Sequence, residues 1–156
     1  MRLLSIAAED LPKVLPMPEA VEAMKSAFAS LSAGRVVAPL RGVVPVDEHD
    51  GITLLMGGYV PGEGMAAKTV SIFNRNRELG RPVVTGLVLV LDPETGEPIG
   101  LVDGGTLTAW RTGAACGAAT DLLARENCRV GALIGAGVQA TTQLLAMDAV
   151  RDLKEI

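Results

Sequence analysis

The chain has 156 residues, of which 49% are hydrophobic and 3% aromatic, and its formal net charge is −4. This length is typical of one globular domain and part of a second, and mild acidity without a basic stripe argues against nucleic acid as a partner. The longest apolar run, near residues 83–91, is too short to span a bilayer, and no basic segment followed by an apolar one opens the chain. We therefore expect a cytoplasmic protein without a membrane span or secretion signal.

The first 34 residues predict a short strand and a helix. Residues 3–6 are apolar enough for the strand, Pro18 suits the first turn of the helix, and Gly34 follows as a stop signal. The side chains expected on the buried face of this helix are Val21, Met24, Phe28 and Leu31.

Between residues 36 and 102 the pattern changes to strands. They are expected at residues 41–46, 52–56, 66–73, 83–91 and 99–102. The segments 47–51, 61–64 and 92–96 between them are rich in Asp, Glu, Pro and Gly, which favour turns. The last of these turns joins two apolar runs, which indicates a hairpin, so we expect a largely antiparallel sheet.

A long, Ala-rich helix is predicted at about residues 107–125. Gly113 and Gly117 inside it each lower helix propensity by roughly 1 kcal/mol relative to Ala, which suggests close packing against another backbone. Asp103 stands before Gly104 and Gly105, where a turn or helix-capping role is favoured over a place in a cleft.

The most informative motif follows this helix. A short apolar strand, residues 130–134, runs into Gly135-x-Gly137-x-x-Ala140 and then into an amphipathic helix. In this fingerprint the first glycine permits a tight turn, the second lets the backbone approach a pyrophosphate, and the alanine permits close helix–strand packing. The backbone of Gly135, Ala136, Gly137, Val138 and Gln139 is therefore expected to bind the pyrophosphate of NAD or NADP at the positive end of the helix.

The chain ends at Ile156, before the further strands that half of a Rossmann domain needs, which predicts the front part of a longer enzyme. Glu155 has about the right spacing for the acidic residue that reads the ribose, but it lies at the expected start of the second strand, so we do not assign it that role. The predicted fold class is α/β, with an N-terminal mixed, largely antiparallel sheet domain with helices over residues 1–125. Residues 126–156 form the first β-α unit of a truncated Rossmann domain.

Other chemistry is poorly supported. Cys116 and Cys128 stand apart without a CxxC motif, so we expect two buried, reduced thiols and neither a disulfide framework nor a metal site. His49 is the only histidine and lies in an acidic turn, which is typical of a solvated loop residue. A Ser-His-Asp arrangement and a P-loop are not supported.

Four segments carry a family resemblance. They are Ala67-Lys68 and residues 92–98, 108–115 and 133–140. Together they resemble the ornithine cyclodeaminase/μ-crystallin family over essentially the whole chain. The resemblance implies a substrate-binding and homodimerisation domain followed by a Rossmann domain, in a group that includes cyclodeaminases, alanine dehydrogenases and imino-acid reductases.

By this resemblance Arg41, Lys68 and Arg111 bind the substrate carboxylate, and Lys68 also assists proton transfer as the catalytic residue. A guanidinium can hold a carboxylate in one orientation, and a charge in an apolar strand such as residues 65–70 is costly without a partner. From the residues alone, the alternatives are an exposed edge-strand arginine, a snorkelling lysine and a surface salt bridge on a helix.

Thr112 is expected to donate its hydroxyl to the cofactor phosphate, and the alternative is a bond back to a carbonyl one turn earlier. Two positions depart from the family pattern. Leu54 stands where cyclodeaminases carry an acidic side chain near the substrate amine, and Val83 follows Pro82 where relatives have a cofactor-facing threonine. The catalytic aspartate of cyclodeaminases lies beyond this chain.

These observations predict an NAD(P)-dependent oxidoreductase that acts on an α-imino or α-keto/amino acid. The alternatives are an ornithine cyclodeaminase, a μ-crystallin-like binder of small molecules and a non-catalytic dimerisation fragment. We expect the 156-residue chain to be inactive alone. The sequence identifies neither the substrate nor the choice between NAD and NADP.

Overall fold

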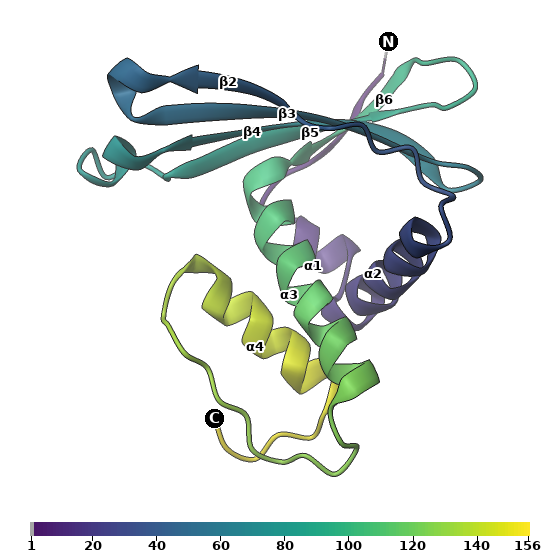
Figure 1. The fold of residues 1–156 in the computed structure, drawn as a ribbon, viewed down its shortest axis with the longest axis vertical. Helices are drawn as coiled ribbons and strands as arrows, with labels where there is room; N and C mark the ends of the chain where they lie inside the picture. The colour runs from purple at the N-terminus through teal and green to yellow at the C-terminus, as the bar shows by residue number, and fades with distance from the viewer. Residues whose placement is uncertain (1) are drawn as a thin grey trace. The chain divides into compact units, whose positions relative to one another are not determined.

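The computed structural model describes residues 2–156, which form two compact units. The sheet unit contains the chain up to Ala8 and Gly34–Gly105, and the helical unit contains Glu9–Ala33 and Thr106–Ile156. The expected boundary after residue 125 therefore falls inside the helical unit. Figure 1 shows the strands and helices of both units.

The sheet unit is built on one six-stranded sheet with the order β1-β6-β5-β4-β3-β2. Its strands are β1 (Leu4–Ile6), β2 (Gly42–Val46), β3 (Gly51–Val60), β4 (Gly64–Phe73), β5 (Val84–Leu91) and β6 (Pro98–Asp103). The short β1 runs parallel to β6, and all other neighbours are antiparallel. This arrangement confirms the predicted mixed, largely antiparallel sheet, including the hairpin between β5 and β6.

The strand β3 is longer than the sequence predicted. It continues through Gly57 and Gly58 to Val60, because these glycines pair with the small residues Ala67 and Ala66 of β4. Glycines weaken a strand in isolation, and here the long hairpin with β4 supplies the compensating ladder.

The sheet has two chemically different faces, because successive side chains of a strand point to opposite sides. One face carries Val70, Val88 and Val102, which are buried. The other face carries Leu55 and Leu87, which are 46% and 48% exposed. We call this second side the open face; its apolar side chains on β3 to β6 include Leu55, Ala67, Leu87, Leu89, Ile99 and Leu101.

The helical unit contains α1 (Leu11–Val14), α2 (Met17–Ser32), most of α3 (Gly104–Leu123) and α4 (Val138–Val150). Its core consists of small and apolar side chains: Met17, Ala20, Val21, Ala114, Ala118 and Ala146. The glycines of α3 permit close helix packing, as predicted. A Cβ atom on Gly117 would lie 2.7 Å from Val21 Cγ2, and one on Gly113 would collide with the backbone carbonyl of Thr142.

A polar cluster joins the helices at the C-terminal end of α3. Asp121 accepts hydrogen bonds from Lys25 of α2 at 2.5 Å and from Arg151 at 2.7 Å. Arg151 is buried and also donates to the carbonyl groups of Thr120, Asp121 and Ala124. One guanidinium thus satisfies carbonyls that the end of α3 leaves without helical partners.

Three sequence predictions for this unit need correction. Phe28 and Leu31 are 47% and 54% exposed, because only the first half of α2 contributes to the core, through Val21. Cys116 and Cys128 are free thiols that are only half-buried, whereas the sequence predicted full burial. The first Rossmann strand is reduced to a single parallel bridge between Val130 and Glu155, since a strand forms only where a neighbour supplies hydrogen bonds.

No helix within residues 2–156 has both the length and the hydropathy needed to cross a membrane.

Candidate functional site

Two of the predicted substrate-binding cations belong to the sheet unit. Lys68 of β4 pairs with Met56 of β3, and Gly42, the first residue of β2, pairs with Leu55 of β3. Arg41 directly precedes Gly42, at the end of β2 that lies beside Leu55, and β3 separates β2 from β4. Arg41 and Lys68 therefore approach the same part of β3, around Leu55 and Met56, from its two sides.

Arg41 itself lies just before the strand on which the sequence placed it. Val37 forms an isolated bridge with Tyr59, whereas Gly42 pairs with Leu55. The β2 side therefore spans one residue more than the β3 side between these pairs, which makes a bulge that keeps Arg41 out of the regular ladder. Arg41 is exposed, so its guanidinium is accessible to an anion.

The surroundings of Lys68 on the sheet are apolar. This half-buried lysine lies between Met56 and Val88, its partners on the neighbouring strands. Leu54 is two residues from Met56 on β3 and faces the same side. A carboxylate bound at Lys68 would therefore have its organic part next to apolar side chains and no sheet carboxylate at position 54 to receive a second amine.

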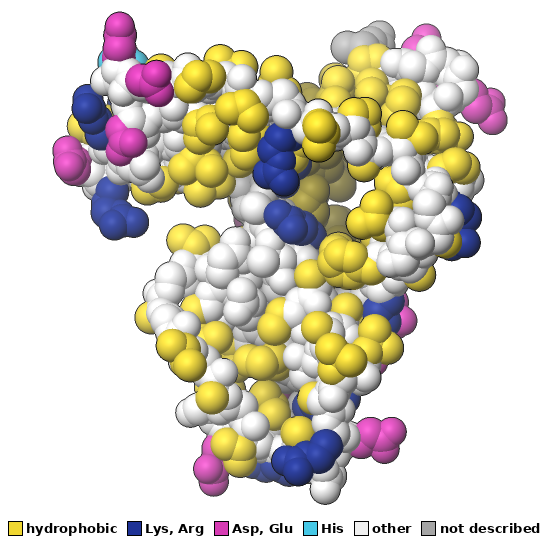
Figure 2. Space-filling model, viewed as in Figure 1, with side chains coloured by type: hydrophobic (Ala, Val, Ile, Leu, Met, Phe, Trp, Pro, Cys, Tyr) yellow, Lys and Arg dark blue, Asp and Glu magenta, His cyan; other side chains and the backbone are white. Residues whose placement is uncertain are grey.

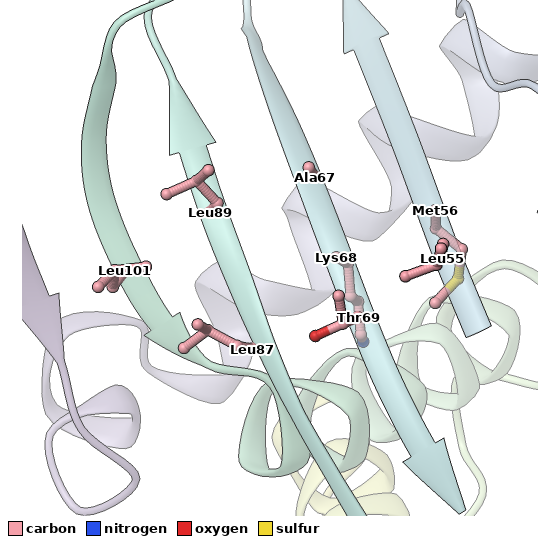
Figure 3. Close-up of a pocket in the computed structure, with 8 residues that line it drawn as sticks. All are labelled: Leu55, Met56, Ala67, Lys68, Thr69, Leu87, Leu89 and Leu101. Carbon is pink, nitrogen blue, oxygen red and sulfur yellow. The ribbon is translucent and has the colours of Figure 1, made fainter. Parts of the chain in front are cut away.

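A hollow of about 310 Å³ lies on the sheet and is lined by Leu55, Met56, Ala67, Lys68, Thr69, Leu87, Leu89 and Leu101 (Figure 3). Most of these side chains belong to the open face. Strand alternation directs Lys68 and Met56 to the opposite side, so the hollow is a depression in an apolar surface. We do not assign it as the carboxylate site.

The third predicted cation, Arg111, lies on α3 in the helical unit and is exposed. Its neighbour Trp110 donates from Nε1 to the carbonyl of Leu15 at 2.8 Å, which fixes this turn of α3. The hydroxyl of Thr112 donates to the carbonyl of Thr108 at 2.6 Å, which is the back-bonded alternative that the sequence left open. Thr112 would have to rotate about χ1 to donate to a phosphate.

The fingerprint loop leads into α4 as the motif requires. Gly135 has a φ of 108°, which favours glycine, and Gly137 is the N-cap residue of α4. A Cβ on either glycine would meet no atom within 4 Å, so the space beside this backbone is open. The first turn of α4 has no acidic residue and no side-chain cap, and thus leaves its N–H groups for an anion. Ala136 and Val138 are exposed, so this loop fits a dinucleotide pyrophosphate.

Gln139 occupies the first turn of α4, and its Oε1 is buried without a hydrogen-bond partner among the residues that the structure describes. Glu155 forms a parallel bridge with Val130, five residues before Gly135 in the chain.

Three other residues were singled out in the sequence: His49, Asp103 and Val83. His49 is exposed in a short 3-10 helix, Asp47–His49, at the turn after β2. Asp103 is the last residue of β6 and directly precedes α3. Val83 accepts a backbone hydrogen bond from Phe73 at 2.9 Å, next to the start of β5. Within residues 2–156, no group of three His, Cys, Asp or Glu side chains is placed to hold a metal ion.

A mixed sheet that carries Lys68, in a chain that also contains a dinucleotide fingerprint at a helix N-terminus, is typical of α/β proteins with a dinucleotide-binding motif. A sequence model described as the ornithine cyclodeaminase/mu-crystallin family matches residues 5–156. The chain belongs to this family, which confirms the resemblance found in its motifs.

Named relatives support this assignment. The Delta(1)-pyrroline-2-carboxylate reductase of Bacillus cereus is 34% identical over 155 residues, which are 99% of this chain and 48% of that protein. The structure of the Thermococcus litoralis enzyme of the same name, in complex with NADH and L-proline, is 40% identical with a TM-score of 0.90 and covers 99% of this chain and 50% of that one. An archaeal alanine dehydrogenase dimer with bound NAD is 33% identical with a TM-score of 0.89, covering 98% of this chain and 47% of that one. The chain thus spans about half the length of the relatives it matches.

Sequence reasoning did not predict that Lys68 pairs with Met56 within a long β3–β4 hairpin. The length of β3, which determines the pairing with β4, was hidden by its two glycines.

Proposed function

We propose that a protein containing this chain reduces an α-imino acid with NADH or NADPH. The observation that carries this proposal is the half-buried Lys68 between apolar side chains of the sheet, with the exposed Arg41 next to the start of β2, in a chain that also has the open glycine loop. The substrate carboxylate accepts hydrogen bonds from these two cations. Arg111 on α3 contributes a third, on the basis of its motif. Residues 126–156 begin the cofactor domain.

The chain's own residues bind and orient the reactants. The N–H groups at the start of α4, with the backbone of Gly135 and Gly137, hold the pyrophosphate, and Thr112 contributes its hydroxyl after rotation. When bound, the nicotinamide supplies a hydride to the carbon that bears the nitrogen. The two sheet cations hold that carbon in one orientation through the adjacent carboxylate, which is worth several kcal/mol of the barrier. Lys68 also holds a proton that the nitrogen can accept.

The apolar position 54 favours a reductase over a cyclodeaminase. A diamino acid would bring a second ammonium group to the side of the sheet that carries Lys68, Met56 and Leu54. Burying that charge without a carboxylate partner is unfavourable. A cyclic or apolar imino acid, such as Δ1-pyrroline-2-carboxylate, meets no such penalty.

The direct test is turnover by an extended protein, in which this chain is followed by a complete cofactor domain. With Δ1-pyrroline-2-carboxylate we expect NADH or NADPH to be consumed in equal amount to the proline formed. The absence of imine reduction, together with unchanged binding of the cofactor, would overturn the proposed reaction.

We also propose that the protein is a homodimer formed through the open face of the sheet. Leu55, Leu87 and Ile99 are 46–48% exposed there, and an apolar surface of this kind marks an interface in soluble proteins. In Figure 2, hydrophobic side chains gather over much of the sheet, charged side chains lie at its left end, and Lys or Arg side chains also lie near its middle. The related archaeal alanine dehydrogenase is described as a dimer.

Sedimentation of the chain tests the dimer. Leu87→Lys places a charge on the open face and is expected to give a monomer, whereas Leu123→Lys, at an 85% exposed position of the helical unit, is expected to leave the dimer intact. A wild-type chain that sediments as a monomer at every concentration would contradict the dimer.

The free thiols of Cys116 and Cys128 agree with a cytoplasmic location, which we propose as well.

A further inference from the structure

The helix α3 contributes mostly small side chains to the helical core. Its two residues in the core cluster are Ala114 and Ala118, and Gly113 and Gly117 make its closest approaches to α4 and α2. Within residues 2–156, Trp110 is the one large side chain of α3 that packs against this cluster. Alanines and glycines let helices come close together, but their flat surfaces interlock little and resist rotation about the helix axis weakly.

A hydrogen bond fixes the orientation of the Trp110 indole. Its Nε1 donates to the carbonyl of Leu15 at 2.8 Å. Leu15 is the C-cap residue of α1 and Pro16 is the N-cap residue of α2, so the acceptor lies in the link between these two helices (Figure 1). Indole N–H groups that leave water need such a partner. The link therefore holds this turn of α3 at one rotation about its axis.

Arg111 follows Trp110 directly, and its side chain leaves α3 in another direction. Successive residues of an α-helix are rotated by about 100° about the helix axis. The indole packs against the core cluster, whereas Arg111 is exposed. Because an extended guanidinium lies roughly 8 Å from the axis, a rotation of about 10° would move it by about 1.4 Å. An error of about 1 Å in the placement of a binding group can lower a rate as much as a hundredfold.

The C-terminal end of α3 is held by separate contacts. Asp121 accepts hydrogen bonds from Lys25 and Arg151. It lies ten residues after Arg111 in the chain, which is about 15 Å along the helix. Loss of the bond from Lys25 would therefore leave the bond at the Trp110 turn in place.

We infer that Trp110 is a positioning residue for the reaction. Its indole N–H, bonded to the link between α1 and α2, sets the rotation of α3 that directs Arg111 to the substrate carboxylate. The inference rests on the proposed function, in which Arg111 binds that carboxylate. In this role Trp110 acts through Arg111 and makes no contact with the substrate itself.

A double-mutant cycle of Trp110→Phe and Arg111→Leu in the extended protein tests this role. Phenylalanine keeps an aromatic ring at the position and removes the N–H. With Arg111 present, we expect Trp110→Phe to lower kcat/KM for Δ1-pyrroline-2-carboxylate about tenfold, mainly through a higher KM. In the Arg111→Leu background the same change should alter kcat/KM by less than about twofold, because the group that it positions is gone.

The matched control is Lys25→Met. This change removes the hydrogen bond from Lys25 to Asp121 at the far end of α3, so we expect a lower Tm. Measured well below that Tm, kcat/KM should stay within about twofold of wild type. If Lys25→Met lowered kcat/KM as much as Trp110→Phe does, the loss would reflect a general loosening of the helices, and the inference would be overturned.

Two other results would also overturn it. One is a Trp110→Phe protein whose kcat/KM is within about twofold of wild type, and the other is an undiminished loss in the Arg111→Leu background. If Arg111→Leu has no effect of its own, the proposed substrate role of Arg111 fails as well, so the two failures differ. If Trp110→Phe does not fold, 3-benzothienylalanine at position 110, which keeps the shape of indole without its N–H, is measured in its place.

Discussion

The proposal that Arg41 and Lys68 bind one carboxylate can be tested by a double-mutant cycle with Arg41→Leu and Lys68→Met. Lys68 pairs with Met56, and Arg41 precedes Gly42, which pairs with Leu55, so the two cations flank the same part of β3. Removing one partner of a desolvated, hydrogen-bonded charge pair costs about 2–5 kcal/mol. Each single change in the extended protein should therefore lower kcat/KM for the imino acid roughly thirty- to several-thousand-fold.

The interaction energy between the two substitutions tests whether both cations bind the same carboxylate. Because both cations bind the same anion, the double variant should lose less than the product of the two single losses, by at least about 0.5 kcal/mol. The assay is the initial rate of NADH or NADPH consumption against imino-acid concentration. Thr69→Val is the matched control, since this neighbour of Lys68 faces the opposite side of the sheet, and we expect an effect within about twofold. Losses that multiply fully would show that the two cations bind different groups, and the shared site would be refuted.

Four further outcomes are expected. Arg111→Leu in the extended protein should lower kcat/KM in the same range of about 2–5 kcal/mol while the Kd of the cofactor changes little; equal effects on both, or none on either, would make Arg111 a cofactor or surface residue. Gly113→Ala should destabilise the chain by about 1–3 kcal/mol in urea unfolding because the new Cβ meets a backbone carbonyl, and Gly58→Ala, which meets open space, should stay within about 0.5 kcal/mol; equal losses would contradict the close helix packing. Hydrogen bonds from Lys25 and then Arg151 lower the pKa of Asp121, so the stability it contributes is present above about pH 4 and is lost as the pH falls through the lower folded-state pKa. Asp121→Asn should thus be less stable than wild type at pH 6, and the difference should shrink as the pH falls below about 4; a constant difference in Tm would argue against this linkage. The 156-residue chain alone should show no turnover, and measurable NADH or NADPH oxidation with any imino or keto acid would overturn this expectation.

The largely antiparallel character of the sheet could be predicted because the turn before the last strand has a strong local signal. Residues 92–96 join two apolar runs, and the structure forms the β5–β6 hairpin there. The length of β3 could not be predicted in this way, because Gly57 and Gly58 resemble a break until their pairing with two alanines is known. The exposure of Phe28 and Leu31 escaped prediction for a similar reason, since helical periodicity shows that a face is apolar and not how much of it is covered.

In the candidate site, too, local motifs could be predicted from the sequence, whereas features that depend on distant neighbours could not. The glycine loop is a local motif, and its backbone conformation at Gly135 follows from the sequence. The strand before it depends on hydrogen bonds from neighbours, so the apolar run at residues 130–134 did not ensure a regular strand. The position of Lys68 beside Met56 depends on the register between β3 and β4, which is not encoded at Lys68 itself. Thr112 was ambiguous in the sequence, and here its hydroxyl donates to the carbonyl of Thr108.

The central claim is that the sheet cations recognise the carboxylate of an imino acid. It is tested most directly by comparing Δ1-pyrroline-2-carboxylate with Δ1-pyrroline, which lacks the carboxylate, as substrates of the extended protein and of its Lys68→Met variant. We predict that the wild-type protein prefers the carboxylated imine by roughly thirtyfold or more in kcat/KM, and that the variant loses most of this preference. A preference that is equally strong in the variant would show that the carboxylate is bound elsewhere and would contradict the account.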